Sequence, residues 1–502
     1  MALRINFNAE ATTTHTALLQ NERAMNKSLL RISTGNRILS AADDAAGLFI
    51  ADQLSTVASA LNQGNSNIQT GISALQIAET NVGQIVDKLQ TIYTKAQSAA
   101  NDINDPNARA ALQSDITNLV DAIKKIATDT EYNGIKLLDG TFESKSIHYG
   151  PRANQTITVG ISSVQASDLG ASVVSGTGQT TSSTNSAYSA LITGDWKSGD
   201  TTDVVKVADK TLSLASGVVD AKSIADAING NPDLKALDIS ARAANTSTAG
   251  TNFTSISSGT GTTTLRFYVG TTTDSSSAIE ITVGASETLT LDQLISKINT
   301  NASTKNLNIT ASKSGERLVL TTTGETIGVE VVSATGGATV NLASLLQNAS
   351  GSVSSATGSA VKVGDLVIIG SDSYNYDFTG ISSTTTGLGL KTQDTSKLKN
   401  LNDIKVNDNA SAELAIDIAN TAIKKVDRVR TQIGSVVNNL QAIYDAQKSA
   451  YDNTKEAENV IRNTDFAEEM STFTTMQIRM QSGMAMLAQA NSLPQLVLQL
   501  LR

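Results

Sequence analysis

The chain has 502 residues, a formal net charge of −9 and no cysteine, so disulfide bonds, thiolate catalysis and cysteine-ligated zinc are excluded. Its basic residues are dispersed rather than gathered into stripes, which argues against nucleic acid as a partner. The chain has only two histidines, His15 and His148, and no H-E-x-x-H motif. We therefore expect no metal site, no cofactor and no enzymatic role.

The N-terminal residues lack the continuous apolar run of a secretory signal, and no segment is long and apolar enough to span a membrane. We expect no membrane insertion. The protein is then either cytoplasmic or leaves the cell by a route that needs no signal peptide.

The first predicted helix ends at Gly35, because glycine accepts the left-handed conformation common at helix C-termini. Its apolar stripe consists of Leu18, Met25, Leu29 and Ile32. Ser40 stands three residues before Asp43, as in a capping box, and Asp43 and Asp44 place negative charge at the start of the next helix. We call residues 35–44 the elbow, where one helix stops and a longer one starts.

The next helix carries an apolar seam in which spacings of four and three residues alternate as far as Ala96. Its first members are Ile50, Leu54, Val57, Leu61, Ile68 and Leu75. Such a pattern is typical of a coiled coil and describes a rod of roughly 70 Å, which needs a partner to bury the seam. Gly64 and Gly71 interrupt the seam and favour a close contact between helices.

A further helix is expected after Asp105 as N-cap and Pro106 at its first position. Beyond it, Asn133 and Gly134 lie between two short apolar runs, a pattern that predicts a β-hairpin.

The region from about Gly150 to Thr395 is rich in Ser, Thr, Gly and Val and contains short alternating runs that predict strands. It also contains a repeat, because residues 223–241 align without gaps to residues 293–311. Ile228 and Asn229 match Ile298 and Asn299. Each copy is predicted to be a short helix followed by a strand.

Near the C-terminus the four-and-three seam returns at Val426, Val429, Ile433, Val436 and Leu440. We expect this seam to pack against the N-terminal one, which makes the chain ends neighbours and the middle an insertion. The alternative is a separate bundle at each end.

The last predicted helix has a one-sided apolar stripe of Phe466, Met470, Phe473, Met480, Met484 and Leu487. Leu498 lies in the leucine-rich segment that follows this stripe. Such a stripe suits a lipid interface or a partner helix. Because few basic residues lie on the opposite face, partner helices are favoured.

Two segments, one near each end of the chain, resemble those of a known protein family. The run LLRISTGNRILSAADDAAGLFIADQL resembles the N-terminal signature of bacterial flagellins, and NVIRNTDFAEEMSTFTTMQIRMQSGMAMLAQANSLPQLVLQLLR resembles their C-terminus. The hairpin segment EYNGIKLLDG is also similar to a family motif, with Tyr132 in place of the usual Phe. The resemblance covers roughly the first 140 and the last 100 residues.

The resemblance implies an α+β fold in which long terminal helices pair in a coiled-coil-like bundle with a β-hairpin, and β-rich outer domains are inserted in the middle. Expected domains are residues 1–43 and 460–502 as inner filament-core helices, 44–170 and 395–459 as a helical rod, and 171–394 as outer domains. The outer part would hold the duplicated module, at about 210–245 and 280–315.

The implied function is that of a structural subunit which self-assembles through its terminal helices into the flagellar filament for swimming. The alternative is a hook–filament junction protein of the same architecture. The implied partners are other copies of the chain, the flagellar export apparatus, a chaperone of the C-terminal helix, the filament cap and hook-associated proteins. The implied location is extracellular, after export without a cleaved signal peptide.

Relatives that activate Toll-like receptor 5 carry a Leu-Gln-Arg-x-Arg-Glu-Leu pattern on the first rod helix. The matching run here begins at Leu89, with Thr91 in place of the first arginine and Lys95 in place of the final leucine. The resemblance therefore implies weak recognition by this receptor.

Overall fold

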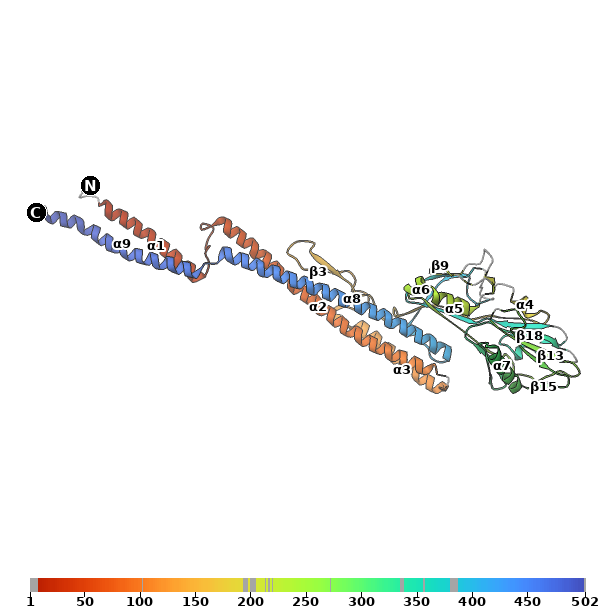
Figure 1. Ribbon diagram of the computed structural model, residues 1–502. Helices are drawn as coiled ribbons and strands as arrows, with labels where there is room; N and C mark the ends of the chain where they lie inside the picture. Colours follow the sequence, from red (N-terminus) through yellow and green to blue (C-terminus); the bar gives the residue numbers. More distant parts are fainter. Residues whose placement is uncertain are drawn as a thin grey trace.

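The computed structural model describes residues 8–101, 103–192, 197–198, 205–212, 214, 217–218, 220–270, 272–334, 338–354, 357–379 and 387–500. The side chains of residues 197–198, 217–218 and 493–500 lie outside this description. The molecule is elongated, with two successive pairs of long helices and a β-rich lobe at the end remote from both termini (Figure 1).

The two ends of the chain pair along their length. Helix α1 (Ala9–Thr34) lies beside α9 (Phe466–Leu500), and α2 (Ala45–Ala99) lies beside α8 (Asn409–Arg462) (Figure 1). Helix α3 (Pro106–Asp129) folds back along α2, with Asp105 as its N-cap. The predicted pairing of the chain ends is confirmed, and the alternative of two separate bundles is wrong.

The rod formed by α2, α3 and α8 has a continuous apolar core. From α2 it contains Leu61, Ile68, Leu75, Ala78, Val82, Ile85, Leu89, Ile92 and Ala96, and from α8 it contains Ala422, Val426, Val429, Ile433 and Leu440. Leu54 and Val436 are half-buried. Burial of these side chains removes apolar surface from water. It stabilises the rod by about 25 cal/mol for each Å² of apolar surface buried.

The first two turns of the seam differ from the prediction. Ile50 and Val57 are 48% and 37% exposed, whereas Ala51 and Ala58 are fully buried. The buried stripe of α2 is therefore displaced by one residue here. Alanine lets two helices approach more closely than isoleucine or valine does, and the larger side chains are left on the surface.

The glycines of the seam also serve a contact that was not predicted. A Cβ atom at Gly64 would lie 1.9 Å from the carbonyl oxygen of Tyr149, and one at Gly71 would lie 2.4 Å from Cδ1 of Ile147. Both neighbours belong to the hairpin of β3 (Lys145–His148) and β4 (Thr156–Val159), which lies on the rod. The close approach at Gly64 is therefore made by this hairpin and not by a helix.

The smaller hairpin of β1 (Glu131–Tyr132) and β2 (Ile135–Lys136) forms where it was predicted. Its two turn residues, Asn133 and Gly134, have φ values of 50° and 75°. Positive φ at both central positions is what the tight two-residue turn of a hairpin requires, and asparagine and glycine adopt it readily.

The described part of the lobe contains three larger sheets. The first has the strand order β16-β17-β11-β22-β5-β25, the second β14-β13-β18-β21-β6, and the third β24-β23-β8-β9. The strands of the first sheet are β5 (Gly170–Gly176), β11 (Ser240–Thr248), β16 (Thr310–Ser314), β17 (Arg317–Thr322), β22 (Asp365–Gly370) and β25 (Lys397–Asn400). Those of the second are β6 (Thr180–Ser183), β13 (Thr263–Val269), β14 (Ile279–Val283), β18 (Ile327–Ala334) and β21 (Gly358–Lys362). Those of the third are β8 (Lys206–Val207), β9 (Lys210–Thr211), β23 (Asn375–Asp377) and β24 (Gln393–Thr395).

Shorter elements complete the lobe. Two-stranded pairs are β7 (Lys197–Ser198) with β10 (Gly217–Val218), β12 (Ile256–Ser257) with β15 (Thr288–Leu289), and β19 (Val340–Asn341) with β20 (Ser352–Val353). The helices are α4 (Tyr188–Leu191), α5 (Ala221–Gly230), α6 (Pro232–Ala236) and α7 (Leu291–Lys305).

The two copies of the repeat have the same internal geometry. In the first, the side chain of Asn229 on α5 donates to the carbonyl of Ala241 at 2.7 Å and accepts from its N–H at 2.9 Å. In the second, Asn299 on α7 makes the same pair of bonds with Ala311, at 2.9 and 2.7 Å. The helix-then-strand prediction is confirmed, and the asparagine fixes each helix to the start of its strand.

The lobe is attached to the rod by one face of the first sheet. Val173 on β5 and Ile369 on β22 belong to the rod core, whereas their neighbours Val174 and Ile368 belong to the core of the lobe. Successive residues of a strand point to opposite faces. This sheet is therefore apolar on both faces and packs against α8 on one of them.

Ion pairs reinforce the same contact. Arg242 on β11 pairs with Glu413 and, at 2.9 Å, with Asp417 of α8. Lys424 of α8 pairs with Asp238 at 2.7 Å. Burial raises the pKa of Asp417, although the neighbouring Arg242 opposes the shift.

We predict that Asn299→Ala destabilises the second copy of the repeat by about 1–2 kcal/mol, because it removes two hydrogen bonds to the backbone of Ala311. Hydrogen exchange measured by mass spectrometry should be faster in β16 and at the end of α7. Asn301→Ala is the control, because in the described part of the chain the Asn301 side chain bonds within its own helix, to the carbonyl of Lys297. Equal effects of the two substitutions would contradict the clamp.

Candidate functional site

The contact between α1 and α9 is made by small residues. The side chain of Ser28 is buried and its hydroxyl donates to the carbonyl of Glu469. A Cβ atom at Gly483 would lie 3.2 Å from Leu18, and buried Ala490 accepts a hydrogen bond from Asn8 at 2.9 Å. Small side chains let the helices approach closely at these points.

The apolar stripes predicted on these two helices are consequently buried only in part. On α1, Leu18, Met25 and Ile32 are half-buried and Leu29 is exposed; on α9, Phe473, Met480 and Leu487 are half-buried and Phe466, Met470 and Met484 are exposed. The side chain of Leu498 lies outside the described residues. Leu19, Leu30, Ile478 and Met486, which were not part of either predicted stripe, are exposed as well. The half-buried members of each stripe therefore mark the side on which the two helices meet, and further large apolar side chains of both helices remain exposed.

Two connectors join the terminal pair to the rod, the elbow (residues 35–44) and residues 463–465, and backbone hydrogen bonds hold them together. Gly35 has a φ of 72° and caps α1, as predicted. Its carbonyl accepts from the N–H of Thr464 at 2.9 Å, and the N–H of Arg37 donates to the carbonyl of Arg462 at 2.7 Å. Asn36 and Asn463 thus form an isolated antiparallel bridge. No local sequence signal indicates this pairing, because the partners are far apart in the chain.

The capping of α2 differs from the prediction. Asp44, and not Ser40, is the N-cap residue, and its carboxylate accepts from the N–H of Gly47 at 2.8 Å. The carboxylate of Asp43 instead accepts from the N–H groups of Leu39 and Ser40, both at 3.1 Å. The predicted Ser40–Asp43 pair therefore closes a tight turn before the helix, and the helix begins one residue after Asp44.

Two ion pairs lie at and beside the elbow. Lys27 on α1 pairs with Asp43, and Arg31 on α1 lies 3.7 Å from Glu469 on α9. The hydrogen bond from Lys27, together with those from the turn backbone, lowers the pKa of Asp43 from 3.8 to about 2. The first ion pair therefore ties α1 to the turn that precedes α2, whereas the second joins α1 and α9 within the terminal pair.

The two residues that replace the receptor pattern lie on the rod. Thr91 is exposed, and its hydroxyl bonds to the carbonyl of Asp87 in the same helix. The ammonium group of Lys95 lies 2.7 Å from the carboxylate of Asp115 on α3. At the position where the receptor pattern has leucine, this surface has a paired charge.

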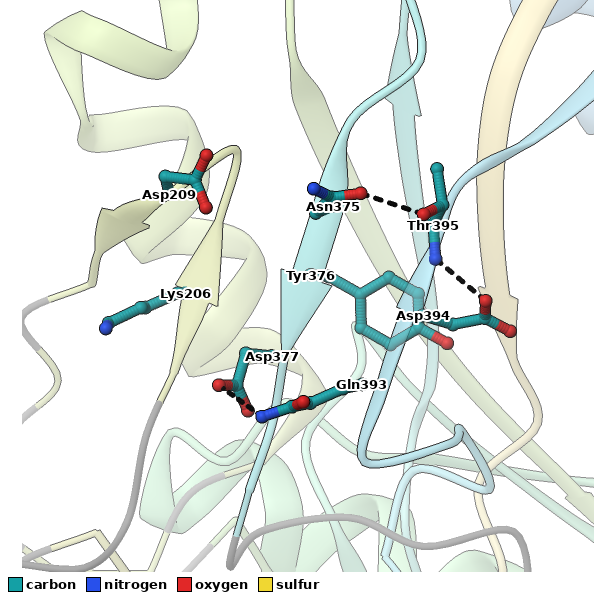
Figure 2. Close-up of a pocket in the computed structure, with 8 residues that line it drawn as sticks. All are labelled: Lys206, Asp209, Asn375, Tyr376, Asp377, Gln393, Asp394 and Thr395. Atoms are coloured by element: carbon teal, nitrogen blue, oxygen red, sulfur yellow. Dashed lines mark hydrogen bonds between the residues drawn. The ribbon is translucent and has the colours of Figure 1, made fainter.

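A polar hollow in the lobe is the main alternative to a site on the helices. Figure 2 shows its lining residues, which come from β8, β23 and β24 and from the turn that follows β8. Its polar groups largely bond to one another, with Gln393 donating to Asp377 and Thr395 donating to Asn375, both at 2.8 Å. In the described residues no group of three or more His, Asp or Glu side chains is placed to hold a metal ion.

None of the described helices is long and apolar enough to cross a membrane.

Comparison with known proteins shows the family to which the chain belongs. Residues 5–143 match the model of the bacterial flagellin N-terminal helical region, and residues 416–501 match that of the C-terminal helical region. Flagellin of Aquifex pyrophilus is 55% identical over 509 aligned residues, and that of Aquifex aeolicus (strain VF5) is 51% identical over 533; both alignments cover 100% of this chain and of the relative. The chain belongs to the bacterial flagellin family. It is a structural subunit of the flagellar filament, and the alternative of a hook-associated protein is not better supported.

Among solved structures, FliC from Burkholderia pseudomallei aligns over 74% of this chain and 99% of its own, with 15% identity and a TM-score of 0.29.

We predict that the Asp43 carboxyl group in the monomer titrates near pH 2. Because its folded pKa of about 2 lies below its ordinary value of 3.8, its contribution to the stability of the elbow is present above pH 3.8 and is lost as the pH falls through 2. Carboxyl carbon NMR of aspartate-labelled monomer measures this midpoint. In Lys27→Met the midpoint should move towards 3.8, and a wild-type midpoint already at 3.8 would show that the pair does not form.

Proposed function

We propose that α1 and α9 build the polymerising core of the filament. The supporting observation is the exposure of large apolar side chains on both helices of the terminal pair, because a pair of helices has no interior in which to bury them. Each such side chain contributes about 1.5–3 kcal/mol when it is fully buried. Neighbouring copies of the chain supply that burial, so we assign to the two stripes the role of the assembly seam.

The rod extends this role outward. We propose that the exposed Ile50 and Val57 of α2 contact neighbouring subunits, whereas Leu54, Leu61, Ile68 and Leu75 hold α2 to the α8 seam of Val426, Val429, Ile433, Val436 and Leu440. The elbow residues Gly35, Ser40, Asp43 and Asp44 set the angle between the two helix pairs. We retain the expected division into terminal helices, rod and outer lobe, with the lobe packed on α8 through Val173 and Ile369.

We also propose that the chain is exported without a cleaved signal peptide and works outside the cell. The exposed apolar residues of α9 favour cover by a chaperone before export, because unassembled apolar surface promotes aggregation. The filament cap and the hook-associated proteins are the further partners that we infer for the same helices, together with the export apparatus.

A purely structural role, with no catalytic activity, completes the proposal. The support is that the polar groups of the lobe hollow mostly bond to one another, which leaves them without the converging donor, base and nucleophile of an active site.

We predict that Ile478→Asp abolishes polymerisation and leaves the monomer folded. Ile478 is 58% exposed in the single chain, so the substitution costs little there, whereas a carboxylate buried between subunits costs several kcal/mol at every lattice position. Seeded elongation followed by light scattering and electron microscopy measures assembly, and circular dichroism measures folding.

The conservative control for this position is Ile478→Leu, which keeps the apolar surface and should elongate on wild-type seeds at the normal rate. Normal elongation of Ile478→Asp on the same seeds would refute the assignment of α9 to the filament core.

We predict weak signalling through Toll-like receptor 5. Loss of a contact arginine at an interface typically costs 2 kcal/mol or more, a factor of about 30 in affinity, and Thr91 and Lys95 replace two residues of the receptor pattern. A reporter-cell assay with purified monomer measures this response. Thr91→Arg combined with Lys95→Leu should raise the signal, and full signalling by the wild-type chain would contradict the prediction.

A further inference from the structure

Two strands of the lobe that belong to different sheets come unusually close at one point. Asn245 lies in β11 of the first sheet, and Lys362 ends β21 of the second. The surrounding backbone is tight: a Cβ atom at Gly364 would lie 2.3 Å from the carbonyl oxygen of Gly324, and one at Gly324 would lie 2.3 Å from Cβ of Ala243. The glycines therefore permit an approach that other residues would prevent.

The side chains of Asn245 and Lys362 meet inside this crossing. Asn245 is 0% exposed and Lys362 is 3% exposed, and Nζ of the lysine lies 3.0 Å from Oδ1 of the asparagine. Nδ2 of Asn245 donates to the carbonyl of Glu325 at 2.9 Å and to that of Lys362 itself at 3.1 Å. The carboxamide is thus held at both ends, with the amine beside its carbonyl group.

The chemical state of the lysine suits a reaction. Burial lowers the pKa of Lys362, against the opposing effect of the carboxylate of Asp365, whose Oδ1 lies 3.8 Å from Nζ. A lower pKa increases the share of neutral amine, which is the nucleophilic form. Asp365 is close enough to carry a proton after a small movement. The further polar neighbour of the amine is the carbonyl of Val363, at 3.5 Å.

We propose that Lys362 and Asn245 are joined by an intramolecular isopeptide bond, formed by the folded chain itself. The three elements of such a reaction, an amine, a carboxamide and a carboxylate, are brought together here by folding. Holding the reacting groups in contact replaces an encounter in solution and lowers the barrier to reaction.

The reaction is a transamidation that needs no oxidant or cofactor. Rotation of the lysine side chain turns the Nζ lone pair towards Cγ of Asn245, and a bond forms between Nζ and Cγ. Asp365 takes a proton from Nζ and delivers it to Nδ2. The bond between Cγ and Nδ2 then breaks, ammonia leaves, and a secondary amide remains between the two side chains.

The link would connect β11 and β21, and hence the first and second sheets, covalently. It would close a loop that contains the elements from β12 to β20. The chain has no cysteine and cannot form a disulfide. The amide would therefore supply a covalent cross-link by another chemistry. The proposal does not depend on how the filament assembles.

Tryptic digestion of the purified full-length chain tests the link directly. Trypsin does not cleave after an acylated lysine, so residues 243–266 should appear attached to an uncut peptide of residues 318–391. The mass should be lower than the sum of the two peptides by one ammonia, about 17 Da. Free peptides of residues 243–266 and 318–362 as the main products would overturn the proposal.

Three variants separate the chemistry from the fold. Lys362→Arg keeps the positive charge but lacks the amine and should give no linked peptide. Asp365→Asn can still accept from the N–H of Gly178, as Asp365 does at 2.8 Å, and should lower the yield of the link at least tenfold. A full yield would exclude Asp365 as the proton carrier. Lys391→Arg, at an exposed lysine, is the matched control and should leave the link intact; loss of the link in this variant would contradict the assigned site.

Discussion

The packing of α2 against α8 is the contact on which the other parts of the molecule depend. These two helices come from opposite ends of the chain, and each has an apolar stripe that is buried only when the other is present. The contact places the N- and C-termini together, gives α3 and the β3–β4 hairpin a surface to pack on, and provides the face that receives the first sheet of the lobe. Long helices in water obtain most of their stability from such packing rather than from intrinsic propensity.

The terminal pair of α1 and α9 differs from the rod, because its apolar stripes are not fully buried within one chain. Its helices approach through Ser28, Gly483 and Ala490, and many of their larger apolar side chains are only half-buried or exposed. A contact of this kind is well formed but buries little apolar area. The rod therefore has a core within one chain, whereas the terminal pair needs other chains, and this difference separates the folding of the subunit from its assembly.

Much of the architecture could be predicted from local pattern. The four-and-three seams, the Asn133–Gly134 turn and the repeated Ile-Asn pair all report on neighbours within a few turns or on a stripe of fixed period. The phase of α2 at Ala51 and Ala58 could not be read in this way, because apolar residues of both registers are present and only the distance between the helices selects one. The N-cap of α2 is a similar case. Two acidic residues follow Ser40, and the second of them, Asp44, is the N-cap.

The remaining features depend on residues that are distant in sequence. The bridge between Asn36 and Asn463 uses backbone groups, which leave no trace in residue type, and the meeting of Asn245 with Lys362 requires two sheets to be placed first. The elbow and the connector between α8 and α9 lie side by side, and both lead from the rod to the terminal pair. A pull on the lobe is therefore shared by two covalent paths in parallel. Because both paths enter the terminal pair at the same end and are bonded to each other there, the pull draws α1 and α9 along together and does not peel one helix from the other.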